Sequence, residues 1–543
     1  MTTTSARDRS GNSPVDSAGP ERESPARFAV RPVLAIAGAA AAILLVRAGR
    51  YDYFGDELYF LAAGRRLSPG YVDQGPLVPL LAHAADLISP GSLVVLRLPA
   101  ILATAAAIVV AAALAREFGG RRGAQVLAAL AYATCPFLVT QAATLSTFAF
   151  DTTLMATVVW LLVRWNRIRD DRLLLAAALV AALDVQVKLL VPVLLAGLAA
   201  GIAVCGPREL FRRPALWIGA LVMAVSALPG VLWQVRHGWP QLAMGSVIRA
   251  EQQAATGGTA GLPVQLALLV GLLGGVLALA GLWASATAVP HRRATLPRIL
   301  PARFWPGSPS DGANRYLAVA ILCQISFVVA TGTRPYYLAG LFPVVFAAGA
   351  VWVLGLGRRW VAAAGGVMAV ISAAIVVVVV FALPRPLTAL DRPTETQSQL
   401  STRLRMFGTS GWDRLRATVV SAYSVLPPPE RERAVIVTRT YWQASALDRP
   451  GIGLPAVYSP DRGFAYFGIP PETATTVLYV APVNAEPALR RVFSDVRPVA
   501  RLDDRLGFPG IDGKLAVWRC DRPRGSWADA WPGLTTNVLD PGI

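Results

Sequence analysis

The stretch GSLVVLRLPAILATAAAIVVAAALA, residues 91–115, is an apolar block long enough to decide the fold class. A helix of about 20 mainly apolar residues spans the hydrocarbon core of a bilayer. Further apolar blocks occur near residues 28–48, 124–142, 147–163, 172–186, 188–205, 214–233, 262–289, 315–331, 336–356 and 360–383. Of the 543 residues, 54% are hydrophobic and 15% are charged, whereas about a quarter are charged in a typical soluble domain. We therefore predict an all-α polytopic membrane protein with about eleven transmembrane helices.

Arginine-rich turns between the blocks set the expected orientation. These turns contain Arg116, Arg121 and Arg122; Arg164, Arg167, Arg169 and Arg172; Arg208, Arg212 and Arg213; Arg292, Arg293, Arg298 and Arg303; and Arg358 and Arg359. Cytoplasmic loops carry an excess of Lys and Arg, so we expect a cytoplasmic N-terminus and an extracytoplasmic C-terminus. A count of crossings that differs from eleven by an even number would give the same orientation, and this alternative stays open. It applies, for instance, if 172–205 is a hairpin that does not fully cross. The same turns account for the net charge of +18 without a nucleic-acid-binding patch.

Composition divides the chain into three segments. Residues 1–27 are rich in Ser, Pro, Arg and Glu and are expected to form a disordered cytoplasmic tail. Residues 28–383 form the predicted transmembrane domain, with an extracytoplasmic loop at 51–90. The more polar residues 384–543 contain short apolar runs typical of strands, at 434–438, 476–480 and 514–519. They predict a small extracytoplasmic α/β domain.

The loop after the first block begins YDYFGDELYFLAAGRRL, residues 51–67, and is acidic. It brings Asp52, Asp56, Glu57 and Asp73 together near the membrane surface. A carboxylate at a low-dielectric boundary has a raised pKa and can act as a general base. Such a base would take the proton of an acceptor hydroxyl that attacks an anomeric carbon, with a lipid phosphate as leaving group. The structural alternatives are a solvated loop or helix cap for Asp56 and Glu57, and an ordinary turn for Asp73.

Two cations have suitable positions to stabilise that phosphate. Lys188 interrupts the apolar run VQVKLLVPVL, and charge inside a membrane is costly enough to suggest a function. Arg334 lies in the short outside turn TGTRPYYLAG and precedes Tyr336 and Tyr337. The alternatives are that Lys188 snorkels or pairs with Asp184 one helical turn earlier, and that Arg334 and the tyrosines are interfacial anchors.

Metal ligands are sparse. The chain has three histidines, His83, His237 and His291, and four cysteines, Cys135, Cys205, Cys323 and Cys520. Their spacing predicts neither a zinc site nor an intramolecular disulfide framework. A divalent cation held by the acidic loop stays open, without ligand spacing to support it.

Several short motifs occur in the order found in one family of membrane enzymes. They are GDELY at 55–59, DQGPL at 73–77, LRLP at 96–99, a lone lysine at 188 and RPYYL at 334–338. The chain resembles the dolichyl-phosphate-mannose protein mannosyltransferase superfamily, which includes bacterial transferases such as the lipid A aminoarabinose transferase. The segment LPGVLWQVRHGWPQL, residues 228–242, is similar to a bacterial subgroup. The resemblance covers about 30–383 and only weakly the tail.

The resemblance implies a GT-C fold and an inverting transferase in the plasma membrane that uses a polyprenyl-phosphate sugar from the outer leaflet. It implies that Asp56, with Glu57 beside it, and Asp73 are the acidic catalytic positions. The donor-binding positions that follow are Lys188, Arg334, Tyr336, Tyr337 and Gln74. Gln74 and Gly75 depart from the pattern, because relatives often have Lys or His and then Pro there, so that one expected phosphate contact is missing.

Three functions compete at this point. The leading hypothesis is a glycosyltransferase whose acceptor is a protein, a lipid or a cell-wall glycan. The alternatives are a transporter or flippase of lipid-linked sugar and an inactive scaffold whose tail binds a partner. The sequence has no evident internal repeat of the kind that many transporters show, which favours the enzyme. In the tail, Tyr441 and Trp442 are candidates for stacking on sugar rings, although buried aromatics of a strand are the favoured interpretation.

Overall fold

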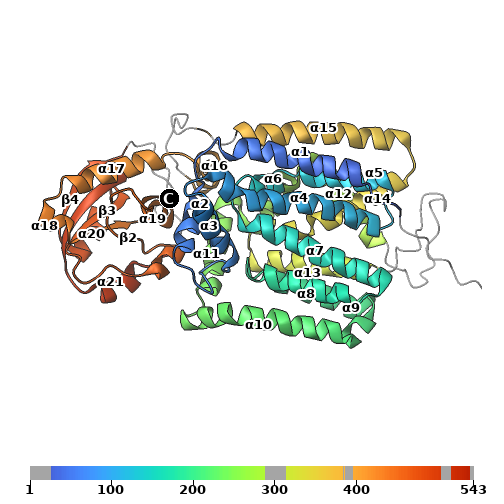
Figure 1. The fold of residues 1–543 in the computed structure, drawn as a ribbon, viewed down its shortest axis with the longest axis horizontal. Helices are drawn as coiled ribbons and strands as arrows, with labels where there is room; N and C mark the ends of the chain where they lie inside the picture. The colour runs from blue at the N-terminus through green and yellow to red at the C-terminus, as the bar shows by residue number, and fades with distance from the viewer. Residues whose placement is uncertain (1–25, 288–313, 383–384, 386–395, 503–514, 538–543) are drawn as a thin grey trace, which may run out of the picture.

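The computed structural model describes residues 26–287, 314–382, 385, 396–502 and 515–537. A bundle of long helices occupies one end of the molecule and a small sheet domain the other (Figure 1). Residues 1–25 of the expected tail lie outside the described residues. The predicted fold class, an all-α membrane domain followed by a small α/β domain, is confirmed.

The bundle contains the predicted apolar blocks. Seven helical segments of the described residues are long and apolar enough to cross a membrane. They involve α1 (Val30–Ala48), α4 (Leu93–Glu117), α7 (Thr147–Ile168), α10 (Pro214–Arg236), η2 with α12 (Gly258–Gly261, Leu262–Thr287), η4 with α14 (Pro335–Leu341, Phe342–Gly355) and α15 (Arg359–Ala382). Shorter helices are α8 (Arg172–Asp184), α9 (Val191–Cys205) and α13 (Tyr316–Thr331), and η1 (Arg208–Arg212) precedes α10. Every predicted block falls on a helix, while the number of crossings, about eleven, stays a prediction.

One predicted block is broken. The helices α5 (Arg122–Ala133) and α6 (Pro136–Ala142) form a pair bent by 62°. Pro136 is the first residue of α6, and a proline can begin a helix but cannot continue one, because it lacks the backbone N–H. After the bend, Val139 and Ala142 of α6 pack in one buried cluster with residues of α1, α4 and α15.

A layer of short helices separates the bundle from the sheet domain (Figure 1). It consists of α2 (Gly55–Gly64), α3 (Leu77–Ile88) and α11 (Pro240–Thr256). A single cluster of buried hydrophobic side chains runs from Leu58 in this layer to Trp412 and Ile436 in the C-terminal domain. The loop predicted at 51–90 is therefore a packed junction between the two domains.

The C-terminal domain holds a five-stranded sheet in the order β2-β1-β3-β5-β4. The strands are β1 (Ala434–Thr438), β2 (Val457–Tyr458), β3 (Thr476–Pro482), β4 (Phe493–Arg501) and β5 (Leu515–Pro523). β1 pairs in parallel with β2 and β3, while β5 is antiparallel to β3 and β4. The helices are α16 (Gln397–Phe407), α17 (Trp412–Ser424), α18 (Pro428–Arg431), α19 (Tyr441–Leu447), η6 (Arg462–Phe467), α20 (Glu486–Val492) and α21 (Trp527–Leu534). The three expected strands are present, and residue 514 lies outside the described part.

The expectation that Tyr441 and Trp442 belong to a strand is wrong, because they begin helix α19. The local reason is a capping box. The Thr440 side chain accepts from the backbone N–H of Gln443, and the Gln443 side chain accepts from the backbone N–H of Thr440. Two otherwise unpaired donors at the start of the helix are satisfied in this way.

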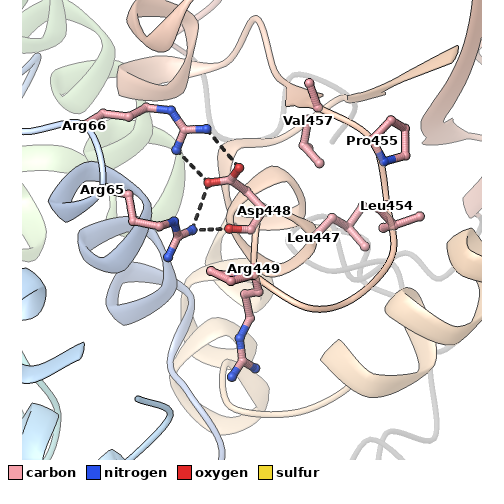
Figure 2. A pocket seen from close by; sticks show the side chains of 10 residues that line it. Arg65, Arg66, Leu447, Asp448, Arg449, Leu454, Pro455 and Val457 are labelled. Carbon is pink, nitrogen blue, oxygen red and sulfur yellow. Dashed lines mark hydrogen bonds and ion pairs between the residues drawn. The ribbon is translucent and has the colours of Figure 1, made fainter. Parts of the chain in front are cut away.

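Charged side chains also join the two domains at the C-terminal end of α2. Figure 2 shows the Asp448 carboxylate between the guanidinium groups of Arg65 and Arg66, with N–O distances of 2.7 to 2.9 Å. An open cleft of about 460 Å³ lies beside this group. Arg65 lies about 14 Å along α2 from Asp56, since the two are nine residues apart and a helix rises about 1.5 Å per residue. This ion-pair group therefore docks the domains away from the acidic cluster.

Candidate functional site

Asp56 lies in the first turn of α2, where the C-terminal domain reaches it. The Tyr441 hydroxyl donates to Oδ1 of Asp56 at 2.9 Å, and the Trp442 indole N–H donates to the same oxygen at 2.8 Å. Burial raises the pKa of Asp56 above its usual range, and the two hydrogen bonds oppose that rise. The charge of Asp73 raises the pKa further, while that of Arg462 lowers it. Asp56 therefore has the environment of a general base.

Asp73 is the second predicted acid, and the fold brings it to Asp56. Its charge acts on Asp56, Tyr337 and Arg462, which come from three different elements. Within the described part of the chain its side chain makes no hydrogen bond. Since it is half-buried and has no such partner, this carboxylate is available to a substrate.

The segment that carries Asp73 pairs with the segment that carries Lys188. The Gly75 backbone N–H donates to the carbonyl of Val187 at 3.0 Å, and Leu77 donates to Gln186 at 3.0 Å. A Cβ on Gly75 would lie 2.1 Å from the Gln186 carbonyl oxygen. Glycine is thus required at position 75 for this close approach of two backbones.

Lys188 lies in an aromatic cage. Its Nζ is 4.3 Å from the ring centre of Phe148 and 5.4 Å from that of Tyr337. Tyr336 meets Phe148 edge-on beside this cage, with ring centroids 4.7 Å apart. The alternative of an ion pair between Lys188 and Asp184 is not realised in the described part of the chain. Within the described residues, neither carboxylate oxygen of Asp184 has a hydrogen-bond partner. Cation–π contacts leave the ammonium donors free for an anion.

Arg334 is held by a residue that the sequence analysis did not single out. Its Nη2 is 2.7 Å from Oε2 of Glu251 in α11, and Nη2 of Arg462 in η6 is 2.6 Å from Oε1 of the same carboxylate. The backbone of Arg462 has φ of +46°, a left-handed conformation that is costly for a non-glycine residue. A further missed cation, Arg405 in α16, acts electrostatically on Arg334 and Tyr336.

The structure gives Glu57 a different environment from the one expected for a catalytic acid. It is fully buried, and Oε1 and Oε2 accept from Nε and Nη2 of Arg97 at 2.9 and 2.7 Å. Oε1 also accepts from the backbone N–H of Leu145, and Oε2 from that of Phe54. The carboxylate is thus saturated with protein donors and has no oxygen facing a substrate.

Gln74 is only 5% exposed, and its Nε2 has no hydrogen-bond partner within the described residues. A buried amide donor without a partner is costly, so this N–H group is available to an acceptor on a ligand. Among the described residues there is no group of three or more His, Cys, Asp or Glu side chains that could hold a metal ion. The open alternative of a divalent cation therefore has no such ligand set in this part of the chain.

Close packing at Gly55 leads to a first prediction. A Cβ at this position would lie 2.0 to 2.5 Å from indole atoms of Trp442. Gly55→Ala is therefore expected to displace Trp442 and weaken domain docking by about 1–3 kcal/mol. The thermal midpoint in detergent and the tryptophan emission spectrum measure this effect. Gly245→Ala is the matched control, because its Cβ would meet nothing within 4 Å; an equal loss of stability in both variants would contradict the prediction.

Some of these residues carried a signal in the sequence. Arg97 is a charge within the apolar block quoted at the outset, and an intramembrane charge suggests a functional or structural partner. Glu251, Arg405 and Arg462 lie in polar segments where a charged residue is ordinary. Only the fold identifies them, because it brings together residues far apart in the sequence. Glu251 and Arg462, for example, are 211 positions apart.

A family model described as dolichyl-phosphate-mannose-protein mannosyltransferase matches residues 73–233. This range includes Asp73, Gln74 and Lys188, while Asp56 and Arg334 lie outside it. A comparison with curated protein sequences finds no match.

Similar folds occur among solved structures. ArnT from Cupriavidus metallidurans in the apo state is 15% identical, with a TM-score of 0.57 over 90% of this chain and 97% of that chain. The same protein bound to undecaprenyl phosphate gives a TM-score of 0.54 with equal coverage. The arabinofuranosyltransferase AftD from Mycobacteria is 15% identical, with a TM-score of 0.51 over 91% of this chain and 40% of that chain. These matches confirm the GT-C fold.

Proposed function

We propose that this chain, which has a GT-C fold, is a multi-pass membrane protein of the dolichyl-phosphate-mannose protein mannosyltransferase superfamily and that it transfers a sugar from a polyprenyl-phosphate carrier to an extracytoplasmic acceptor. The observation that carries the proposal is the meeting of two carboxylates and two cations from four separate segments. Asp56 and Asp73 interact electrostatically, and the charge of Asp73 also acts on Tyr337. The ring centre of Tyr337 lies 5.4 Å from Nζ of Lys188. The fold similarity to ArnT bound to undecaprenyl phosphate supports a carrier of this kind.

The proposed step is a single displacement at the anomeric carbon. An acceptor hydroxyl attacks C1 of the sugar, and Asp56 takes the hydroxyl proton. The bond between C1 and the phosphate oxygen breaks, and the electron pair leaves with the polyprenyl phosphate. Attack opposite to the leaving group inverts the configuration at C1. Asp56 contributes through general-base catalysis, for which a raised pKa brings the carboxylate closer to the working pH.

Lys188 and Arg334 are proposed to bind the carrier phosphate, with Gln74, Tyr336 and Tyr337 beside them. Arginine and lysine stabilise phosphate charge that develops as the leaving group departs, without a metal ion. Glu251 holds Arg334 in place and leaves the remaining N–H groups of its guanidinium for a phosphate. Asp73 is proposed to orient the acceptor or the sugar through its carboxylate.

Glu57 is proposed to act through position alone. It ties the start of α2 to Arg97 in α4 and to the backbone before α7. These contacts fix the turn that presents Asp56, its neighbour in the sequence. We therefore propose a positioning role for Glu57 in place of the catalytic role that the resemblance implies.

The carrier-binding residues lead to a second prediction. Lys188→Met is expected to weaken binding of undecaprenyl phosphate by about 10- to 100-fold, because it removes a charge-assisted contact and keeps the apolar stem in the cage. Binding is measured with the purified protein and undecaprenyl phosphate in detergent. Arg50→Met is the control, since Arg50 is an exposed arginine in the turn that follows α1. Equal affinity of wild type and Lys188→Met would remove Lys188 from the site.

Donor consumption tests the proposed function. The purified protein is incubated in separate tubes with polyprenyl-phosphate mannose, glucose and arabinose, each radiolabelled in the sugar, with crude membranes as the source of acceptor. We expect one of the sugars to leave its carrier. If every donor stays intact, the protein does not transfer these sugars. That result favours the transporter interpretation over the enzyme.

A further inference from the structure

We propose that the C-terminal domain completes the active site, with Tyr441 and Trp442 as positioning residues that hold Oδ1 of Asp56 so that Oδ2 receives the acceptor proton. The inference rests on the proposed function only in naming Asp56 as the base. It assigns a role to a domain that the family match, over residues 73–233, does not include.

Both hydrogen bonds converge on one atom. The Tyr441 hydroxyl and the Trp442 indole N–H lie 2.9 and 2.8 Å from Oδ1 of Asp56. Within the described residues Oδ2 accepts no hydrogen bond. A carboxylate held through one oxygen keeps a fixed plane, so the lone pairs of the other oxygen have a defined direction. That is the geometry that a base needs toward a bound hydroxyl.

The two donors are themselves firmly placed. Tyr441 and Trp442 are 7% and 3% exposed. The backbone N–H of Tyr441 donates to Oδ2 of the buried Asp461 at 3.0 Å. The Trp442 ring packs edge-on against Phe54 with centroids 5.1 Å apart, and it fills the space over Gly55 where a Cβ would clash. Such over-determined side chains hold a catalytic group more precisely than a mobile loop does.

A second contact aligns the same surfaces. A Cβ on Gly463 in η6 would lie 1.9 Å from the Tyr59 hydroxyl. Tyr59 stacks on Phe467 with centroids 5.9 Å apart and meets Tyr441 edge-on at 5.3 Å. Gly55 in α2 thus makes room for the ring of Trp442 from the C-terminal domain, and Gly463 in that domain makes room for Tyr59 from α2. The register between α2 and the C-terminal domain is thereby fixed next to Asp56.

The donors have a chemical consequence besides orientation. The titratable and charged groups that face Asp56 are Asp73, Arg462, Tyr441 and Tyr59. Hydrogen bonds to a carboxylate favour its charged form, so Tyr441 and Trp442 counteract the rise in pKa that burial causes. Without either donor the pKa of Asp56 rises further. The base is then protonated over more of the pH range and is inactive there.

An infrared titration tests the proposal without needing a donor sugar. The full-length protein in detergent is titrated, and the difference between wild type and Asp56→Asn isolates the carboxyl band of Asp56. Tyr441→Phe and Trp442→Phe each remove one donor and keep an aromatic ring. We expect the midpoint of the Asp56 band to rise by about one pH unit in each variant. An unchanged midpoint in either variant overturns the proposal that both donors hold the base.

Trp412→Phe is the matched control. Trp412 donates its indole N–H to the carbonyl of Tyr53 at 2.8 Å, in the same interface but without a bond to Asp56. Its removal is expected to lower stability and leave the midpoint in place. With an active donor, kcat/KM should show the same upward shift of its acid limb in Tyr441→Phe. If Asp56→Asn is inactive while neither phenylalanine variant moves the midpoint, the positioning role fails and the proposed function stands; if Asp56→Asn is fully active, the proposed base fails.

Discussion

Asp56→Asn is expected to lower the rate of sugar transfer by about 100- to 10,000-fold, the contribution typical of a general base. Asparagine has the size of aspartate, and its carbonyl oxygen can still accept from Tyr441 and Trp442. The protein should therefore fold and bind undecaprenyl phosphate as the wild type does. The measurement is kcat/KM with the donor that the wild type consumes, together with the thermal midpoint of both proteins.

Asp52→Asn is the control for that variant. Asp52 lies in the same loop and accepts a hydrogen bond from its neighbour Tyr53 at 2.7 Å, away from the C-terminal donors. It should retain most of the activity. A rate for Asp56→Asn within a factor of a few of the wild type would contradict the role of Asp56.

The pH dependence of the wild type follows from the same environment. Because Asp56 must be deprotonated to accept a proton, activity falls as the pH falls through its pKa. Burial raises that pKa, so the acid limb of kcat/KM is expected above the ordinary aspartate value of about 3.9. An acid limb at or below that value would show that burial does not govern this carboxylate.

Arg97→Met is expected to destabilise the folded protein by about 3–5 kcal/mol, the typical cost of removing one partner of a buried ion pair. The side chains of Arg97 and Glu57 are both fully buried. Arg97 also donates to the carbonyls of Ala48, Tyr51 and Asp52. Methionine fills a similar volume but removes the guanidinium from these carbonyls and leaves the Glu57 carboxylate with only its two backbone donors and no counter-charge. The thermal midpoint in detergent should drop well below that of the wild type.

Two further variants separate charge from volume. In the double variant Arg97→Met with Glu57→Gln, part of the stability should return, because no charge is left unpaired. Arg122→Met replaces an exposed arginine and should change stability by no more than about 0.5 kcal/mol. A similar midpoint for all three variants would show that the Glu57 pair does not stabilise the fold.

The membrane domain could be predicted from sequence because its signal is local. An apolar block such as 91–115 must form a helix in a bilayer, since every backbone polar group needs an internal partner there. The charge of the turns adds an orientation but fixes no exact number of crossings. Short helices such as α8 and α9 show why, since their lengths alone do not decide whether they span.

The candidate site could be predicted only in part. Asp56 and Asp73 were expected together, and the fold brings them within electrostatic range. Adjacent Asp56 and Glu57 could not be told apart, because the difference depends on which one faces Arg97 in another helix. The contact of Asp56 with Tyr441 joins residues 385 positions apart. No local pattern encodes such a contact, whereas the capping box at Thr440 could have identified the start of α19.

A donor with two labels tests the central claim most directly. The carrier-linked sugar that the wild type consumes is prepared with tritium in the sugar and phosphorus-32 in the phosphate, and it is incubated with purified protein and membrane acceptors. Cleavage between C1 and the phosphate oxygen predicts that tritium moves to an acceptor product while phosphorus-32 stays on the polyprenyl lipid. If both labels remain together on the lipid, or both move together, the protein does not catalyse the proposed transfer.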